Sequence, residues 1–278
     1  MSDDYTEDTL IEQPAIALFA ELGWETADCY EETYGPEGTL GRETSSEVVL
    51  RSKLYPALER LNPDLPQEAF RLASEELTRD RSLMSPVQAN REVYELLKDG
   101  VKVTYRDADG IQTTDTVHLI DWGTPENNDY FLASQFWITG DMYKRRTDLL
   151  GFVNGLPIVL VELKATNKNV KDAFDNNLRD YKDAIPQLFW YNAFIILSNG
   201  DEARIGTLTS GWEHFAEWKK INDEGEQGII SLETMLRGTC EPERLLDLVE
   251  NFILFAESSL LSQANFSIQY PMRLPSIS

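Results

Sequence analysis

The chain has 278 residues, of which 42% are hydrophobic and 10% aromatic, so it can fill a core and wholesale disorder is excluded. Its 48 acidic and 25 basic residues give a formal net charge of −23, which counts against a stand-alone nucleic-acid binder because phosphate contacts need clustered Lys and Arg. The two cysteines, Cys29 and Cys240, exclude a disulfide scaffold and a zinc cluster.

The first hundred residues have the apolar spacing of helices. The predicted helices cover residues 6–22, 44–61, 67–79 and 86–99. The second of them begins with the capping-box pair Thr44 and Glu47, although Pro56 falls in its middle. Residues 26–43 are polar and contain glycines, which predicts a loop.

From residue 101 onward, apolar and polar residues alternate, which is the period of β-strands. The predicted strands cover residues 101–107, 116–122, 131–140 and 193–198, and the first two are expected to form a hairpin. A helix is expected at about residues 169–185, and a final helix from about Glu241 to Leu261. This order of helices, strands with one crossover helix, and more helix predicts a mixed α/β domain.

The segment TDLLGFVNGLPIVLVELK, residues 147–164, predicts a strongly hydrophobic hairpin with NGLP as its turn. Asp148 opens the first strand, and Glu162 and Lys164 end the second. Side chains alternate along a strand, so Glu162 and Lys164 share a face, and the hairpin returns both to the neighbourhood of Asp148. Two carboxylates there suit a hard cation such as Mg²⁺, which can polarise a phosphodiester, while a lysine can orient the nucleophile or shield the phosphate.

The same three residues also allow a plainer interpretation. Charged residues are common at strand ends because strand ends meet water, and an Asp–Lys pair there is usually a surface salt bridge of little energetic value. The spacing of these three residue types recurs by chance in many proteins. The spacing alone therefore leaves both interpretations open, and the surrounding sequence has to decide between them.

The surrounding sequence resembles the N-terminal nuclease region of the restriction (R) subunit of type I restriction–modification enzymes. The resemblance covers residues 6 to about 225 and is carried, in family order, by GRETSSEVVLRSKLYPALERLNP, LIDWGTPENNDYFLASQF, VNGLPIVLVELK, IPQLFWYNAFIILSNG and EARIGTLTSGWEHFAEW. It implies an α/β fold with a restriction-endonuclease-like (PD-(D/E)xK) core, in which a central mixed β-sheet is flanked by helices. Residues 1–262 would form the endonuclease domain, with a helical part over 1–100, a catalytic sheet core over about 101–210 and a helical C-terminal part, followed by a tail at 263–278.

Carried over residue by residue, the resemblance implies that Asp148, Glu162 and Lys164 are catalytic. Asp148, Glu162 and the backbone carbonyl of Leu163 would be the metal ligands. Glu12, on the first predicted helix, resembles a helical acid that some related nucleases add to the metal site. An ordinary solvated carboxylate on a helix face is the alternative interpretation for Glu12.

Accessory residues are expected on both sides of this site. The family has a Q-x-x-x-Y element on the helix after the hairpin, and Asn177 and Tyr181 stand at that position. They are four residues apart and hence on one helical face, where they could contact the lysine or the DNA backbone. The basic run Lys144, Arg145 and Arg146 precedes Asp148 and could touch phosphates, or be a solvated strand end.

The resemblance further implies a Mg²⁺-dependent endonuclease, with Mn²⁺ as an alternative metal, that hydrolyses DNA non-specifically after ATP-driven translocation. ATP would act only through motor domains that lie outside these 278 residues. The expected partners are double-stranded DNA and the methylation (M) and specificity (S) subunits. Two alternatives stay open: a non-catalytic docking module of the restriction complex, which the net charge favours, and a stand-alone PD-(D/E)xK nuclease of a defence or repair system.

The start of the chain, MSDDYTEDTL, is acidic where a signal peptide would be basic and then apolar. No uninterrupted apolar run approaches the ~20 residues that a membrane span needs. We therefore expect a cytoplasmic protein with no membrane partner.

Overall fold

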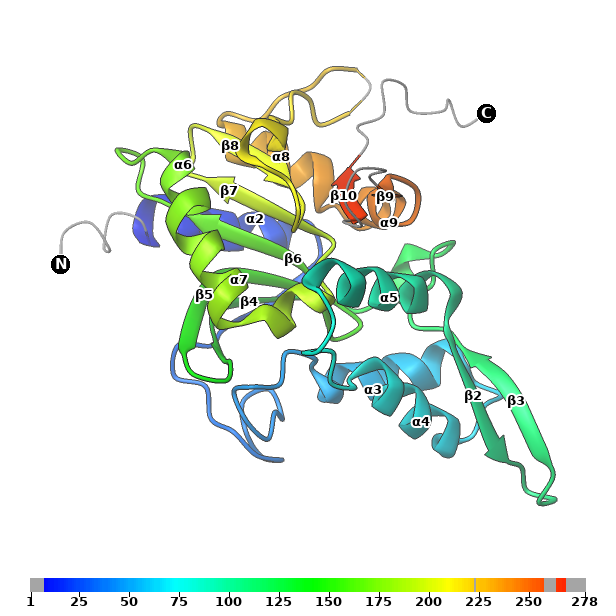
Figure 1. The fold of residues 1–278 in the computed structure, drawn as a ribbon. Coiled ribbons are helices and arrows are strands. Elements are labelled where there is room, and N and C mark those ends of the chain that lie inside the picture. The colour runs from blue at the N-terminus through cyan, green and yellow to red at the C-terminus, as the bar shows by residue number, and fades with distance from the viewer. Residues whose placement is uncertain (1–7, 223, 258–263, 269–278) are drawn as a thin grey trace.

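The computed structural model describes residues 8–222, 224–257 and 264–268, which include a mixed six-stranded sheet with helices on both faces (Figure 1). In spatial order, the sheet consists of β1 (Glu25–Asp28), β4 (Tyr130–Thr139), β5 (Lys144–Val153), β6 (Leu156–Leu163), β7 (Phe194–Ser198) and β8 (Ala203–Gly206). Strand β1 is parallel to β4, and β6 is parallel to β7, whereas the other neighbours are antiparallel. The expected central mixed sheet flanked by helices is confirmed.

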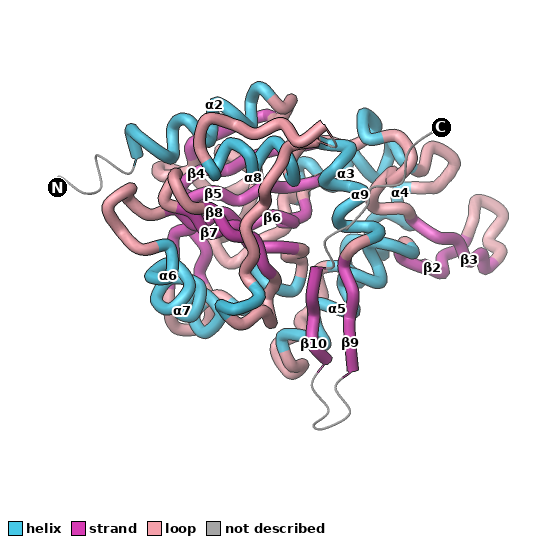
Figure 2. Tube along the Cα trace, turned by 90° about the horizontal axis from the view of Figure 1, so that it is seen from above, coloured by secondary structure: helices cyan, strands magenta, loops and turns pink. Residues whose placement is uncertain are grey.

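The helices lie in two layers around this sheet and in a group beside it (Figures 1 and 2). Their bounds are η1 (Asp8–Glu12), α2 (Gln13–Glu21), α3 (Arg51–Leu61), α4 (Gln67–Leu77), α5 (Pro86–Asp99), α6 (Val170–Asp172), η3 (Ala173–Leu178), α7 (Arg179–Ala184), α8 (Ser231–Thr239) and α9 (Pro242–Asn251), with short 3₁₀ turns η2 (Pro125–Asn127), η4 (Pro186–Trp190) and η5 (Trp212–His214). Helix α2 contacts β1 and β4, and the continuous α6–η3–α7 segment contacts β5, β6 and β7 from the other face. No helix in the described part of the chain combines the length and apolar character that crossing a membrane requires.

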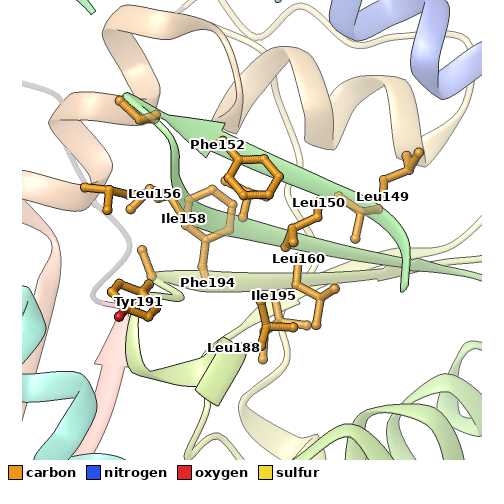
Figure 3. Packing of buried hydrophobic residues seen from close by; sticks show 14 of the residues in the cluster. Leu149, Leu150, Phe152, Leu156, Ile158, Leu160, Leu188, Tyr191, Phe194 and Ile195 are labelled. Atoms are coloured by element: carbon orange, nitrogen blue, oxygen red, sulfur yellow. The ribbon is translucent and has the colours of Figure 1, made fainter. Parts of the chain in front are cut away.

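The hairpin of β5 and β6 forms the centre of the core. Every residue of β6 is buried, and its apolar side chains pack with those of β5 and β7 (Figure 3). Burying a large aliphatic or aromatic side chain contributes roughly 1.5–3 kcal/mol, so this apolar hairpin is a major source of the stability of the fold. The sequence pattern predicted this element correctly.

The turn of this hairpin has a backbone conformation that its sequence favours. Asn154 and Gly155 have φ values of 50° and 80°, which is the left-handed pair of a two-residue hairpin turn. A Cβ atom at Gly155 would lie 2.4 Å from the carbonyl oxygen of Leu50, so only glycine fits. The buried Asn154 side chain also donates to the carbonyl oxygen of Leu119 at 2.9 Å. These contacts fix where β5 turns into β6.

Two expectations for the N-terminal part are wrong. Residues 25–28, at the start of the predicted loop, form the edge strand β1 by pairing with β4. The helix predicted from Thr44 begins only at Arg51, because Leu50 is extended and donates its N–H to the Gly155 carbonyl oxygen at 2.8 Å. Glu47 accepts a hydrogen bond from the backbone N–H of Glu43 at 2.7 Å, so the capping box does not form. Contacts with the β5–β6 turn override the local helical signal.

The hairpin at residues 101–117 lies outside the central sheet. Strands β2 (Val101–Arg106) and β3 (Gln112–Val117) pair only with each other in the described part of the chain, although they were expected in the catalytic sheet core (Figure 1). The strand predicted to run to residue 122 ends at Val117, because the Asn62 side chain binds both the N–H and the C=O of His118, at 2.8 and 2.9 Å. The Asn62 side-chain amide thus makes the two backbone hydrogen bonds that a neighbouring strand would otherwise make.

The C-terminal part also differs from the expected long helix. Helix α8 was not predicted, and α9 ends at Asn251, where the prediction continued to Leu261. Residues Ile253–Glu257 form β9, which pairs antiparallel with β10 (Ala264–Ile268) in the predicted tail. Residues 258–263 and 269–278 lie outside the described part.

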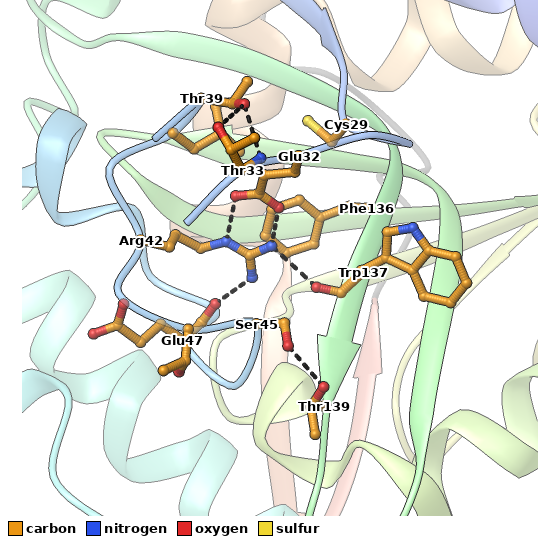
Figure 4. A network of polar contacts seen from close by, with 12 residues as sticks. Cys29, Glu32, Thr33, Thr39, Arg42, Ser45, Glu47, Phe136, Trp137 and Thr139 are labelled. Carbon is orange, nitrogen blue, oxygen red and sulfur yellow. Dashed lines mark hydrogen bonds and ion pairs between the residues drawn. The ribbon is translucent and has the colours of Figure 1, made fainter. Parts of the chain in front are cut away.

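A buried ion pair anchors the irregular segment 29–50 to the sheet (Figure 4). The side chains of Arg42 and Glu32 are 1% and 0% exposed and form a salt bridge with two hydrogen bonds. The Arg42 guanidinium also donates to the carbonyl oxygens of Glu47 and Trp137, at 2.7 and 3.0 Å, and lies 3.9 Å from the centroid of the Phe136 ring. Four of the five N–H donors of Arg42 therefore make structural hydrogen bonds, and Arg42 is not a surface cation.

We predict that Arg42→Gln lowers the free energy of unfolding by about 3–5 kcal/mol, because it leaves the buried Glu32 carboxylate without its cation. Denaturant unfolding at neutral pH measures this loss. The matched control is Arg91→Gln, which breaks an exposed pair with Glu95 and is expected to cost less than about 1 kcal/mol. Equal losses in the two variants would contradict the anchoring role of Arg42.

Candidate functional site

The open end of the β5–β6 hairpin brings its charged residues together. Leu149 pairs with Val161, and one further step along the same register sets Asp148 opposite Glu162. The two carboxylates therefore project from the same face of the sheet. Asp148 Oδ2 accepts a hydrogen bond from the backbone N–H of Leu163 at 2.7 Å. The convergence that the sequence predicted is present, and its chemical role stays a prediction.

Glu162 is the most desolvated group of the site. It is 1% exposed, and its Oε1 accepts hydrogen bonds from the Asn177 side-chain amide and, at 3.3 Å, from Lys164 Nζ. Its Oε2 is buried and has no hydrogen-bond partner among the residues that the structure describes. Burial raises the pKa of Glu162 well above the usual range, and the nearby Asp148 charge raises it further. One oxygen of a costly buried carboxylate is thus left available for a proton or a cation.

Asp148 and Lys164 complete the polar end of the hairpin. Burial raises the pKa of Asp148, while the Leu163 N–H and the charges of Lys164 and Arg146 oppose that rise. Lys164 Nζ lies 2.9 Å from the carbonyl oxygen of Leu163, the backbone group expected to bind a metal ion. That carbonyl oxygen has a second lone pair, so the lysine contact leaves one acceptor direction open.

The helical segment after the hairpin covers this end of the sheet (Figure 1). Asn177, on η3, donates to Glu162, and Tyr181, on α7, donates its hydroxyl to the Arg146 carbonyl oxygen at 2.7 Å. Burial and the Glu162 charge both raise the pKa of Tyr181 well above its usual value, so the hydroxyl stays protonated. The two residues predicted from the Q-x-x-x-Y position therefore lie against the site.

The basic run that precedes Asp148 divides between the two sheet faces. Lys144 and Arg146 share the face of Asp148, because residues two apart on a strand point to the same side. Arg145 instead forms a salt bridge with Asp180 on α7. Lys144 and Arg146 thus remain beside the site, whereas Arg145 is paired with a residue of helix α7.

Glu12 is buried but belongs to a different contact. Both of its carboxylate oxygens accept from the Gln135 side-chain amide, at 2.8 and 2.7 Å. Among the described residues, no group of three or more Asp, Glu, His or Cys side chains is arranged to hold a metal ion, so Glu12 does not form such a cluster with Asp148 and Glu162. Its expected role as a ligand stays a prediction.

Gln135 is the residue of this region that the sequence reasoning missed. It has φ 55°, a left-handed conformation in the middle of β4, where non-glycine residues rarely occur. The β4–β5 register pairs Ser134 with Leu149 and Phe136 with Thr147, which leaves Gln135 opposite Asp148. In the sequence, the only indication of this residue is that Gln135 is a polar amide within an apolar strand. That pattern does not predict its left-handed backbone conformation.

The donor set fits a hard divalent cation. Such ions bind carboxylate and carbonyl oxygens, and the site offers Asp148, the unpartnered Oε2 of Glu162 and the Leu163 carbonyl oxygen on adjacent strand ends. A cation there would offset the mutual repulsion and the desolvation that raise both carboxyl pKa values. The oxygen ligands of this set suit a hard cation better than a metal that prefers nitrogen or sulfur ligands.

The chain has relatives of known class. The family model of the type I restriction enzyme R protein N terminus matches residues 4–214. The type I restriction enzyme HindI endonuclease subunit of Haemophilus influenzae is 34% identical over 262 residues, which is 90% of this chain and 24% of that protein. The putative type I restriction enzyme MjaIXP endonuclease subunit of Methanocaldococcus jannaschii is 29% identical over 288 residues, which is 92% of this chain and 26% of that protein.

Two conclusions follow from these matches. The chain spans about a quarter of the length of the curated relatives that it matches. The family model covers most of the chain, including every predicted site residue from Glu12 to Tyr181. The chain therefore belongs to the family of the type I restriction enzyme R protein N terminus.

Proposed function

We propose that this chain is the Mg²⁺-dependent DNA-cleaving domain of a type I restriction endonuclease subunit, with a PD-(D/E)xK nuclease core. The observation that carries the proposal is the pairing of Asp148 and Glu162 at the open end of a buried hairpin, with the Lys164 ammonium on Glu162. Two desolvated carboxylates and one amine are costly to place together in a fold. Binding of a cation and a phosphodiester would offset this desolvation cost.

The proposed ligands of the cation are Asp148, Glu162 and the Leu163 carbonyl oxygen, with Mn²⁺ as an alternative to Mg²⁺. When bound, the cation would polarise the phosphodiester and stabilise the charge that develops on it. Glu12 would be an additional ligand only if its carboxylate left the Gln135 side-chain amide, which donates to both of its oxygens.

The residues of the chain itself have separate roles in this proposal. Lys164, whose Nζ contacts Glu162 and the Leu163 carbonyl oxygen, would orient the attacking water or donate to the phosphate oxygens. Asn177 holds one oxygen of Glu162, and the other oxygen, which has no hydrogen-bond partner among the described residues, would bind the cation. Tyr181 fixes the strand end through the Arg146 carbonyl oxygen. A water molecule would attack the phosphorus in line with the leaving oxygen. Cleavage by these groups would act on the phosphodiester backbone and would therefore be non-specific.

The relatives support the proposed setting. Their names describe endonuclease subunits of type I restriction enzymes, and this chain matches about a quarter of their length. We infer that double-stranded DNA is the substrate, that methylation and specificity subunits are the partners, and that ATP is hydrolysed by motor domains outside this chain. Cleavage would then follow translocation.

A docking module is the second candidate function, and the net charge of −23 is the observation that favours it. An acidic surface suits a basic partner more than it suits DNA. In that case the fold would hold other parts of a restriction complex together, and the charged hairpin end would have no catalytic role. A stand-alone nuclease would instead cleave DNA without partners or ATP.

We predict that Lys164→Ala lowers DNA cleavage by at least about a hundredfold, the usual effect of removing one group that stabilises a transition state. The variant is made in the full-length subunit and assembled with its methylation and specificity subunits. ATP hydrolysis and cleavage of unmethylated plasmid are measured separately, and ATP hydrolysis is expected to persist. Lys171→Ala, which removes an exposed lysine paired with Asp175, is the control. Unchanged cleavage in Lys164→Ala would favour the docking module.

The pH dependence of stability offers a second prediction. Glu162 has a raised pKa in the folded chain, so the folded state binds more protons than the unfolded state, and stability falls as pH rises from the usual Glu pKa of about 4.3 toward the raised value. Excess Mg²⁺ is expected to reverse this loss at about pH 8 and to have little effect at about pH 5. Thermal unfolding with Mg²⁺ and with a chelator measures both effects.

Glu162→Gln removes the titrating group and is expected to be more stable than the wild type at about pH 8 in chelator, with a much smaller Mg²⁺ effect. Glu31→Gln, at an exposed position, is the control and is expected to behave as the wild type. The same pH slope and the same Mg²⁺ effect in Glu162→Gln and wild type would rule out Glu162 as the cation ligand.

A further inference from the structure

A second cluster of side chains continues from Asp148 along the same face of β4 and β5. Its members are Tyr30, Trp137, Lys144 and Arg146, which we call the basic–aromatic strip. The register pairs Trp137 with Arg146, two residues from the position where Gln135 faces Asp148. Side chains two residues apart on a strand share a face, so the strip leads directly to the carboxylate pair.

The rings and cations of the strip are in mutual contact. The Arg146 guanidinium lies 5.1 Å from the centroid of the Tyr30 ring and 5.4 Å from that of Trp137, and Lys144 Nζ lies 4.7 Å from the Trp137 ring. The Trp137 indole N–H donates to the Tyr30 carbonyl oxygen at 3.1 Å. Figure 4 shows Trp137 pointing away from the buried Arg42 network that anchors its backbone. The Arg42 and Tyr30 hydrogen bonds thus fix the position of Trp137 within the strip.

The structure gives the cations of the strip no acidic partner among its described residues. Within the part of the chain that the structure describes, Lys144 and Arg146 form no salt bridge, although the chain has 48 acidic and only 25 basic residues. Both side chains are exposed, and the Tyr30 side chain is 53% exposed. The charge of Arg146 acts on Asp148, which places it within electrostatic reach of the site. Cations without a described acidic partner, beside aromatic rings, suit a ligand that has both anionic groups and planar rings.

We propose that the basic–aromatic strip binds one nucleic-acid strand with unpaired bases and leads it to the Asp148–Glu162 pair. Cations on the strip match the phosphates, and the Tyr30 and Trp137 rings with the Arg146 guanidinium match the faces of the bases. In an intact duplex the base faces are stacked on one another and cannot reach these rings. The inference rests on the proposed function and names the local form of its substrate: a strand whose pairing is opened at the cleavage point.

The test is binding of labelled oligonucleotides to the full chain, measured by fluorescence anisotropy at low salt with Ca²⁺ in place of Mg²⁺. A single strand is compared with a blunt duplex of the same sequence, and polyglutamate serves as an anionic competitor without bases. The single strand is expected to bind several-fold more tightly than the duplex, and polyglutamate is expected to compete poorly. Equal affinity for strand and duplex, or effective competition by polyglutamate, would overturn the inference.

Two variants test the strip itself, and both change exposed side chains. Tyr30→Leu and Arg146→Gln are each expected to weaken single-strand binding about fivefold to a hundredfold, the range for losing one base–aromatic stack, with little effect on duplex binding. Tyr105→Leu and Arg106→Gln, on the separate β2–β3 hairpin, are the matched controls. Circular dichroism confirms that each variant is folded, and unchanged affinity in both strip variants would refute the assignment.

The binding assay and the cleavage assay can fail independently. If Lys164→Ala still cleaves DNA in the assembled complex, the proposed function fails, whatever the strip binds. If the strip variants bind a single strand as the wild type does while Lys164→Ala abolishes cleavage, the nuclease proposal stands and the strip is ordinary surface.

Discussion

The Asn154–Gly155 turn sets the register between β5 and β6, and this register decides where Asp148 and Glu162 lie. Side chains alternate along strands, so a slip of one residue would turn one carboxylate away from the other. Gly155 packs directly on the carbonyl oxygen of Leu50, and the Leu50 N–H binds the Gly155 carbonyl oxygen. This tight turn therefore connects helix α3, through Leu50, to the hairpin that positions the candidate site.

The apolar hairpin that stabilises the fold also makes its charged end expensive. The same burial that favours Leu160 and Val161 raises the pKa of Glu162, whose Oε2 lacks a hydrogen-bond partner among the described residues. Lys164 and Asn177 offset part of this cost through the other oxygen. A fold selected for stability alone would place a leucine there. The energetic cost of the buried carboxylate is explained if a bound cation and phosphate offset it.

Local patterns predicted the elements whose stability is local or strongly apolar, such as the β5–β6 hairpin and helix α5. They failed where a distant group supplies the hydrogen bonds: Asn62 ends β3 at His118, and the Gly155 carbonyl oxygen keeps Leu50 extended. Asp148, Glu162 and Lys164 could be identified because they lie close together in sequence around one turn. Gln135 and the Tyr30–Trp137 contact could not, because strand register and a left-handed backbone bring them to the site.

The proposed nuclease depends on a divalent cation at the charged end of the hairpin, where it would bind a DNA phosphate. The most direct measurement is a crystal structure of this chain with Mn²⁺ and a short DNA strand, in which anomalous scattering locates the metal. We expect an anomalous peak between Asp148, Glu162 and the Leu163 carbonyl oxygen, with a phosphate beside Lys164. A metal and a phosphate bound elsewhere, with Lys164 Nζ still on Glu162 and on the Leu163 carbonyl oxygen, would rule out this assignment.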